Sequence, residues 1–437
     1  MGKKLITCLV YFFIIAFSTE LTLFAAENKT RSSKTKQQRK VAGSKKILKK
    51  GKKNKAKKKY SKIGISPDDR KISAIIDNQQ KFEIKQKKIP VKTKNKGVPE
   101  ICLNNSSQQQ KSVKTNNDSN KQNKSLIEAK DNLKSHIKRS LVANDVSGSL
   151  VDYIHNHLEY HEPTKKKHAE VVRRKMIDFI EKYKVQERVK MGKMYKKQYR
   201  DVLMEIENLF NVDAEAVLAI WGMETNYGEF IGKSDAFNAL YSACMNAGSI
   251  SRLRYFENNI IALAILVDRG YFEKDVISSF DGGLGGCQFM PDSFYRYAVS
   301  LSGDRKTDII NSNEDVLASI ANYLHSFGWR YGQGILTEIK LPEIFDPCLI
   351  GMNTVKTVGE WKKLGIKPDK NKVGKRHMND DLAMASIILT DPNDTYEETP
   401  NKRAFLVYDN YKVIMGYNRQ LAYGLTTGLI FEGIIEN

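Results

Sequence analysis

Positive charge is distributed very unevenly along this chain of 437 residues, and that distribution limits where a folded core can form. Residues 27–140 contain 34 Lys and Arg but 9 Asp and Glu, whereas residues 141–437 contain 36 Lys and Arg against 40 Asp and Glu. The basic stretch is also rich in Asn, Gln and Ser. Such a composition cannot bury enough apolar surface to offset the entropy lost on folding. We therefore expect a disordered basic tail over residues 27–144 and a folded region over residues 145–437.

The first residues are organised like a secretory signal. Two lysines precede an apolar run over residues 5–17, and the small residues Ala25 and Ala26 follow it. This order predicts a signal peptide over residues 1–26 and export to the periplasm. An uncleaved membrane anchor is the alternative, although the run is shorter than the ~20 residues of a membrane-spanning helix. Export permits one disulfide but does not identify its pair among Cys102, Cys244, Cys287 and Cys348.

The basic tail has two interpretations. It is either a solvated linker or an electrostatic arm that holds the folded part near an anionic wall polymer or membrane surface. Nucleic acid would also attract such a tail. We expect no nucleic-acid partner, because an exported protein rarely meets one.

From about residue 145 the apolar residues recur every three or four positions, which is the spacing of one helical face. We expect helices over 168–184, 195–210, 255–269, 292–301 and 314–326. Short strands are expected near 335–341 and 404–415. The predicted fold class is therefore mainly α.

A helix that begins after Asp213 contains the main chemical clue. Val217, Ile220, Trp221 and Glu224 share one of its faces. A glutamate among large apolar side chains is desolvated, and desolvation raises the pKa of a carboxyl group. A general acid that protonates a glycosidic oxygen near neutral pH needs such a pKa. The alternative at this point is a structural glutamate paired with a buried arginine or a helix end.

A long glycine-rich loop follows over residues 278–291. No Lys-Ser or Lys-Thr pair follows its glycines, so a phosphate-binding loop is not indicated. Glycines let the backbone approach a bulky, flexible ligand closely. The loop therefore fits a substrate-binding role better.

Four blocks of sequence, in this order, resemble the lytic murein transglycosylase B family. Residues 220–228 match the family's G-V-E-T-x-W/Y-G signature, and residues 285–291 resemble its M-G-x-x-Q-F-M-P loop. Residues 321–329 match A-N-Y-F followed by G-W. Residues 417–423 match Y-N-x-S-x-x-Y, with Gln420 in place of the serine. The resemblance covers roughly residues 185–437.

The resemblance implies a goose-type lysozyme-like catalytic core with helical accessory parts. It also implies lyase-type cleavage of the MurNAc-β-1,4-GlcNAc bond in the glycan strands of peptidoglycan. Glu224 would first protonate the leaving oxygen. As a carboxylate it would then remove the proton of the C6 hydroxyl, which closes a 1,6-anhydro ring. The N-acetyl oxygen of the substrate would replace an enzyme nucleophile, outside the usual two-carboxylate scheme.

The resemblance also assigns substrate-binding positions. Ser279 falls where a serine orients the N-acetyl group, and Asn418 falls where an asparagine helps to hold the same region. The other positions implied in the cleft are Tyr227, Arg252, Tyr255, Gln288, Met290, Tyr323, Tyr417 and Tyr423. No cofactor is required.

Three departures from the family pattern bear on function. Ser251 stands in place of one arginine of a pair, which leaves Arg252 alone. Asp281 replaces a small residue beside Ser279, where it would either cap a turn or restrain a water and favour hydrolysis. The family's calcium loop is degraded in this chain. Calcium prefers several anionic oxygens, and this loop offers few of them. Its remaining candidate ligands are Ser302, Asp304 and Asp315, and we expect no tight site.

Two other functions fit the same sequence. The first is a hydrolytic muramidase that acts on the same glycan, and the second is a wall-binding scaffold without catalysis. The sequence does not distinguish cleavage at strand ends from cleavage within strands, and it gives no oligomeric state.

Overall fold

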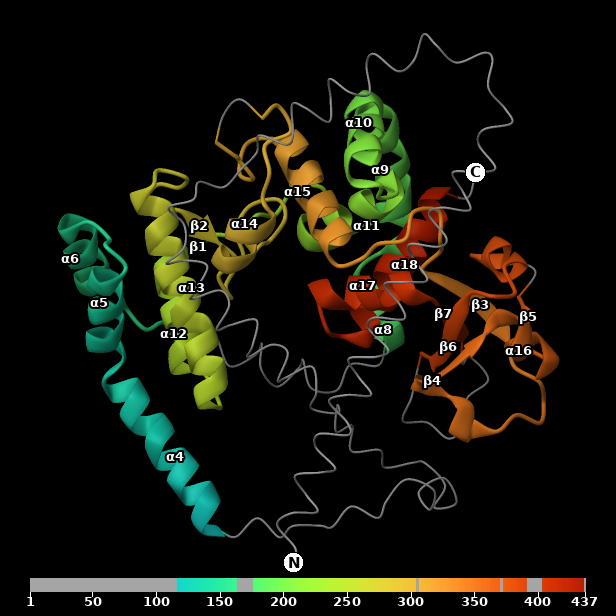
Figure 1. The fold of residues 1–437 in the computed structure, drawn as a ribbon, viewed down its shortest axis with the longest axis horizontal. Helices are drawn as coiled ribbons and strands as arrows, with labels where there is room; N and C mark the ends of the chain where they lie inside the picture. The colour runs from blue at the N-terminus through green and yellow to red at the C-terminus, as the bar shows by residue number, and fades with distance from the viewer. Residues whose placement is uncertain (1–115, 163–175, 304–305, 370–371, 391–402, 436–437) are drawn as a thin grey trace, which may run out of the picture. The chain divides into compact units, whose positions relative to one another are not determined.

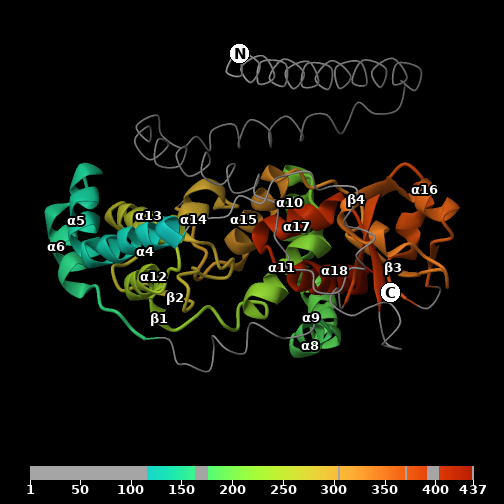
Figure 2. The same cartoon turned by 90° about the horizontal axis from the view of Figure 1, so that it is seen from below.

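Helices form most of the computed structural model, which describes residues 116–162, 176–303, 306–369, 372–390 and 403–435 (Figures 1 and 2). The helices before the glycine-rich loop are α4 (Asn116–Asp131), α5 (Leu133–Ala143), α6 (Gly148–His157), α8 (Met176–Lys182), α9 (Val185–Gln198), α10 (Arg200–Phe210), α11 (Ala214–Thr225), α12 (Ala236–Met245) and α13 (Ile250–Asp268). Those after it are α14 (Pro291–Tyr297), α15 (Asn313–Ser326), α16 (Val358–Lys363), α17 (Asp409–Tyr417) and α18 (Leu421–Ile435). The predicted fold class, mainly α, is confirmed.

The predicted helices differ from the observed ones mainly in their ends. α13, α14 and α15 correspond to the predicted 255–269, 292–301 and 314–326. The segment predicted as one helix over 195–210 is divided between α9 and α10, with Tyr199 between them. α8 covers the end of the predicted 168–184, and the first part of that range lies outside the described residues.

α11 is the central helix of this part of the molecule. It packs against α9, α15 and α18 (Figure 1). Its side chains are buried on every side from Ala216 to Met223, so it is not the one-faced helix that the spacing predicted. Asn226 ends the helix in the left-handed conformation, with φ 53°.

Asp213 stands at the N-cap of α11 but its side chain makes no capping hydrogen bond. Its carboxylate instead accepts from Trp329 Nε1 at 2.8 Å and from the backbone N of Gly332 at 3.1 Å. The residue therefore connects the start of α11 to the turn after α15.

A five-stranded antiparallel sheet follows the helical part in sequence, in the order β4-β6-β7-β3-β5. Its strands are β3 (Leu336–Lys340), β4 (Gly351–Thr357), β5 (Lys367–Pro368), β6 (Met384–Leu389) and β7 (Ala404–Val407), with the short 3-10 helices η3 (Pro347–Leu349) and η4 (Lys375–Asn379) in its connections. The predicted strand over 404–415 is wrong beyond Val407, because α17 begins at Asp409.

The sheet is buried on both faces. Phe405 and Val407 of β7 belong to the core shared with the helices, whereas Ala404 and Leu406 belong to a second core with Trp361 of α16. Alternate residues of a strand point to opposite faces. The same short strand thus serves two cores.

A short two-stranded ribbon lies at the start of the glycine-rich loop. β1 (Ser234–Asp235) pairs with β2 (Ile277–Ser278) in antiparallel fashion. Gly232 has φ +106°, and a Cβ at this position would lie 2.0 Å from the carbonyl oxygen of Ser278. Only glycine permits this approach, which places Ser279 directly after the ribbon.

The predicted disordered tail over 27–144 is wrong for its last part. Residues 116–144 contain α4 and α5, and Leu133, Ile137 and Leu141 of α5 are buried. These residues recur every four positions and let α5 pack on α6 and α13. The average composition hid this short apolar stripe. The predicted signal over 1–26 and the rest of the tail, to residue 115, lie outside the described residues.

Two further observations concern the cysteines and the hydropathy of the helices. Cys348 is disulfide-bonded, whereas Cys244 and Cys287 are buried free thiols. Among the residues that the structure describes, none of the helices is both long enough and apolar enough to cross a bilayer.

We expect Ile137→Ala to lower the free energy of unfolding by about 2–4 kcal/mol, because Ile137 is 1% exposed in the interface of α5. Val142→Ala is the control on the same helix, since Val142 is 60% exposed, and should change it by less than about 0.5 kcal/mol. Urea unfolding of both variants measures this. Equal effects would show that α5 does not belong to the folded core.

Candidate active site

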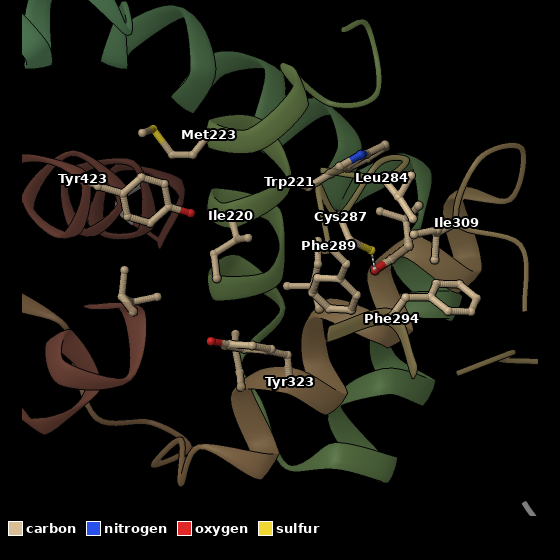
Figure 3. Packing of buried hydrophobic residues seen from close by; sticks show 14 of the residues in the cluster. Ile220, Trp221, Met223, Leu284, Cys287, Phe289, Phe294, Ile309, Tyr323 and Tyr423 are labelled. Carbon is tan, nitrogen blue, oxygen red and sulfur yellow. Dashed lines mark hydrogen bonds between the residues drawn. The ribbon is translucent and has the colours of Figure 1, made fainter. Parts of the chain in front are cut away.

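Glu224 lies in the last turn of α11 and faces a tyrosine from a distant part of the chain. Its Oε1 accepts a hydrogen bond from the Tyr423 hydroxyl at 2.5 Å. Tyr423 is buried on α18, and Figure 3 shows its hydroxyl directed towards α11. Glu224 itself is half-buried, whereas the residues before it in α11, from Ala216 to Met223, are buried.

The surroundings of Glu224 favour its protonated form. Burial raises the pKa of its carboxyl group to about 7, although the hydrogen bond from Tyr423 opposes the rise. The shift therefore needs no second carboxylate nearby. A group with a pKa near neutrality can both donate and accept a proton at physiological pH.

The groups that Glu224 influences in turn are weak acids. Its charge contributes to raising the pKa of the Cys287 thiol and of the Tyr417 and Tyr423 hydroxyls, all of which burial raises most. All three groups are therefore neutral near pH 7. Of the three, the Tyr423 hydroxyl contacts the carboxyl group directly.

Thr225, the next residue, fastens the glycine-rich loop to α11. Its Oγ1 lies 3.3 Å from two acceptors, the carbonyl oxygens of Trp221 and Gly286, and it accepts from the N of Gly228 at 2.9 Å. No role for Thr225 was predicted from the sequence. Its position next to Glu224, in the block over residues 220–228, was the feature that could have indicated one.

The loop brings Ser279 and Gln288 together around Gly283. Ser279 Oγ accepts from the N of Gly283 at 2.9 Å. A Cβ on Gly283 would lie 3.0 Å from Ser279 Oγ and 3.2 Å from Gln288 Oε1, so a side chain there would push these atoms away by a few tenths of an ångström. Gln288 Nε2 donates to the carbonyl oxygens of Ile231 and Gly285 at 3.2 and 3.0 Å. Both side chains are thus held in place by the backbone.

Aromatic rings from three elements pack beside the loop. The Tyr417 hydroxyl donates to the carbonyl oxygen of Cys287 at 2.6 Å. The ring of Tyr323 on α15 lies 4.7 Å from that of Tyr417 and 5.8 Å from that of Phe289. Figure 3 shows Tyr323 next to Phe289. The rings join α15 and α17 to the loop.

Asn418 ends α17 and begins the turn into α18. Its Oδ1 accepts from the backbone N of Gln420 at 3.1 Å. Asn418 therefore has a local role in shaping the turn that leads to Tyr423. This bond involves only the backbone of Gln420, so it does not depend on the residue type there.

Tyr255, Arg252 and Met290 belong to the α13–α14 side. Tyr255 is half-buried, and its ring lies edge-on to Phe256 at 5.2 Å. Arg252 is exposed, with its guanidinium 5.0 Å from the Phe256 ring. Met290 is the partly exposed residue at the N-cap of α14.

Tyr227 does not line the cleft as the resemblance implied. It is 5% exposed, and its hydroxyl donates to the carbonyl oxygen of Arg188 on α9 at 2.6 Å. Its left-handed backbone, with φ 63°, turns the ring back against α11. Tyr227 therefore packs against α9 and α11.

The candidate calcium ligands are engaged elsewhere or not described. Both carboxylate oxygens of Asp315 accept backbone hydrogen bonds, from Leu301 N at 3.1 Å and Asp308 N at 2.8 Å. Ser302 Oγ lies 3.0 Å from Ser300 Oγ, and Asp304 lies outside the described residues. Within the described part of the chain, no three His, Cys, Asp or Glu side chains gather as a metal site would require.

Comparisons with known proteins identify the family of this chain. The family described as "Transglycosylase SLT domain" matches residues 128–430, which include all four sequence blocks. Membrane-bound lytic murein transglycosylase B of Escherichia coli K12 is 30% identical over 195 residues, which are 44% of this chain and 52% of that protein. The chain therefore matches about half the length of this curated relative.

Solved structures show the same fold. SltB3 from Pseudomonas aeruginosa, in complex with NAG-anhNAM-pentapeptide, aligns with a TM-score of 0.60 and 27% identity over 70% of this chain and 80% of that one. Slt35 from Escherichia coli, in complex with bulgecin A, aligns with a TM-score of 0.56 over 69% and 92% of the two chains. At 20% identity, the second likeness supports the fold alone.

The pKa of Glu224 predicts how stability depends on pH. Because the folded-state pKa of about 7 exceeds the ordinary 4.5, the folded protein binds the proton more tightly, and the free energy of unfolding falls as pH rises between those values. Glu224→Gln should therefore be more stable than wild type by roughly 1–3 kcal/mol at about pH 8, with little difference at about pH 4.

Urea unfolding at both pH values measures this, with the exposed Glu273→Gln as the matched control. The control should differ from wild type by the same small amount at both pH values. An equal difference at both for Glu224→Gln would mean that this carboxyl group titrates normally.

Proposed function

We propose that this chain, which belongs to the transglycosylase SLT-domain family, cleaves the MurNAc-β-1,4-GlcNAc bond of peptidoglycan and leaves 1,6-anhydroMurNAc ends. One observation carries the proposal: Glu224 is half-buried, its carboxyl group has a pKa of about 7, and that group accepts a hydrogen bond from Tyr423. The complex of SltB3 with NAG-anhNAM-pentapeptide supports the choice of ligand.

In the first step, protonated Glu224 donates its proton to the glycosidic oxygen while the bond from that oxygen to C1 of MurNAc breaks. The bonding electrons leave with the GlcNAc oxygen, and the N-acetyl oxygen of the substrate stabilises C1. The Tyr423 hydroxyl stabilises the carboxylate that remains, because it already donates to Glu224 Oε1.

In the second step, the Glu224 carboxylate removes the proton of the C6 hydroxyl, and the C6 oxygen forms the bond to C1. The proton returns to Glu224, so the residue ends as it began and no water is consumed. One carboxyl group serves as acid and then as base, which a pKa near the working pH allows.

The substrate contacts fall into two groups. Ser279, Gln288 and Asn418 would orient the N-acetyl group and nearby polar atoms, with Tyr323, Tyr417 and Tyr423 behind them. Arg252, Tyr255 and Met290 would contact the glycan or its peptide along α13 and α14. Ser279 and Gln288 suit their role because backbone bonds hold both in place before any ligand arrives.

We expect Glu224→Gln to digest purified sacculi more slowly than wild type by a factor on the order of 10²–10⁴, because the amide cannot transfer a proton. Mass analysis of the wild-type products in ¹⁸O-labelled water should show anhydro ends without label. The exposed Glu273→Gln should act like wild type.

The rival functions give different results in the same experiment. A hydrolytic muramidase would add ¹⁸O to the new ends, and a scaffold without catalysis would release no products in either form. Asp281→Asn tests the hydrolytic alternative further. Asp281 is exposed in the turn after Ser279, so a capping role predicts unchanged products, whereas a role in restraining water predicts loss of any labelled product.

The location of the protein is part of the proposal. The signal-like start and a curated relative named as membrane-bound support export to the periplasm and association with the membrane. The basic residues 27–115 would act as an electrostatic arm towards the anionic wall or membrane surface.

Deletion of residues 27–115 should weaken binding to sacculi or anionic vesicles at low salt by more than at high salt, because salt screens exposed charges. Cosedimentation of the Glu224→Gln protein, with and without these residues, measures binding without digestion. The deletion stops before α4 and spares the described helices. Equal loss of binding at both salt concentrations would refute the electrostatic arm.

A further inference from the structure

Arg188 binds the back of the helix that carries Glu224. Its Nε donates to the carbonyl oxygen of Gly222 at 2.9 Å, and its Nη1 donates to the carbonyl oxygen of Tyr183. Gly222 lies two residues before Glu224, so their Cα atoms are about 200° apart around the helix axis. Arg188 thus reaches the last turn of α11 from the side opposite the reacting carboxyl group.

The same turn is held a second time through the backbone of Arg188. The Tyr227 hydroxyl donates to the Arg188 carbonyl oxygen at 2.6 Å. A Cβ on Gly222 would lie 2.7 Å from Cζ of the Tyr227 ring, and one on Gly192 would lie 2.8 Å from its hydroxyl oxygen. The two glycines therefore let Tyr227 fill the space between α9 and α11. Little room remains for this turn to move.

The other end of the guanidinium reaches the segment beside Tyr423. Arg188 stacks on the ring of Tyr183, 5.2 Å from its centroid, as well as bonding its carbonyl oxygen. Tyr183 follows α8, which packs on α18, the helix of Tyr423. Tyr183 also contributes slightly to raising the pKa of the Tyr423 hydroxyl, which burial raises most. One side chain therefore contacts both the Glu224 helix and the support of its partner.

The charge of Arg188 is placed where a helix end benefits from it. Burial lowers the pKa of the guanidinium, which means that its charge is partly removed from water. Its directed bonds go to two carbonyl oxygens, and one of these belongs to the last turn of α11. The carboxyl end of a helix carries partial negative charge, and a cation there stabilises it.

We propose that Arg188 is a positioning residue for the glycan cleavage proposed above, on which this inference rests. By fixing the last turn of α11 against Tyr183, it holds the carboxyl group of Glu224 at the Tyr423 hydroxyl, aimed at the glycosidic oxygen. A displacement of about 1 Å in a catalytic group can cost on the order of 10² in rate. Loss of Arg188 should therefore slow the chemical step more than it weakens substrate binding.

The test compares Arg188→Met with Arg403→Met by steady-state kinetics on a soluble peptidoglycan glycan fragment. Arg403 is a matched control, because it too is half-buried, stacks on an aromatic ring (Phe405, 5.1 Å) and bonds through its guanidinium, here to Glu338. It belongs to the sheet rather than to the helices around Glu224. We expect Arg188→Met to lower kcat about 10- to 100-fold with KM within about threefold. Arg403→Met should keep kcat within about twofold.

Thermal unfolding gives the temperature range in which each variant is fully folded, and the kinetics are measured within that range. A lower kcat there reflects loss of positioning and not general loss of structure. Arg188→Lys keeps the charge but loses the fork of donors, and should recover part of the lost kcat. If Arg188→Met does not fold, Arg188→Lys and Tyr227→Phe provide the test, and each should lower kcat with little change in KM.

Two outcomes would overturn the inference: equal kcat for Arg188→Met and Arg403→Met, or a loss in Arg188→Met that appears only in KM. Glu224→Gln, measured in the same assay, distinguishes failure of the inference about Arg188 from failure of the proposed function. An inactive Glu224→Gln with a fully active Arg188→Met rejects Arg188 alone. A fully active Glu224→Gln rejects the proposed function.

Discussion

The hydrogen bond between Glu224 and Tyr423 joins two largely buried helices, α11 and α18, and the arrangement of the candidate site depends on it. A carboxyl group next to a helical core costs free energy when ionised unless a donor supports it. Here burial raises the pKa to about 7 and the tyrosine limits the rise. Without burial the group would be an ordinary carboxylate. Without Tyr423 the ionised form, which the second step of the proposed reaction needs, would cost more free energy.

The surrounding packing keeps this balance in place. α11 and α18 are buried along most of their lengths, so neither helix can shift without disturbing its neighbours. Thr225 fastens the glycine-rich loop to the same helix end. The loop then presents Ser279 and Gln288, which the backbone holds. The proposed reactive and binding groups therefore share one rigid support, which is arranged before any ligand binds.

Residue patterns indicated a candidate site but said little about its framework. They singled out Glu224 because a carboxylate stood among apolar residues inside a specific block of sequence. Tyr227 occupied an equally characteristic position, but its left-handed backbone turns it behind the helix, and spacing alone does not report backbone conformation. The all-round burial of α11 depends on three helices from distant parts of the chain. The stripe of Leu133, Ile137 and Leu141 was present but was obscured by lysine-rich neighbours. Strands as short as β5 leave almost no periodic signal.

The partners in the central hydrogen bond are 199 residues apart in the chain. Contacts of such long range form late, since a long loop must close before they stabilise anything. α18 is also the last helix that the structure describes. A chain shortened before Tyr423 would carry the glutamate without its donor. Assembly of the candidate site therefore waits for α18, and a copy truncated before this helix lacks the hydrogen-bonded pair.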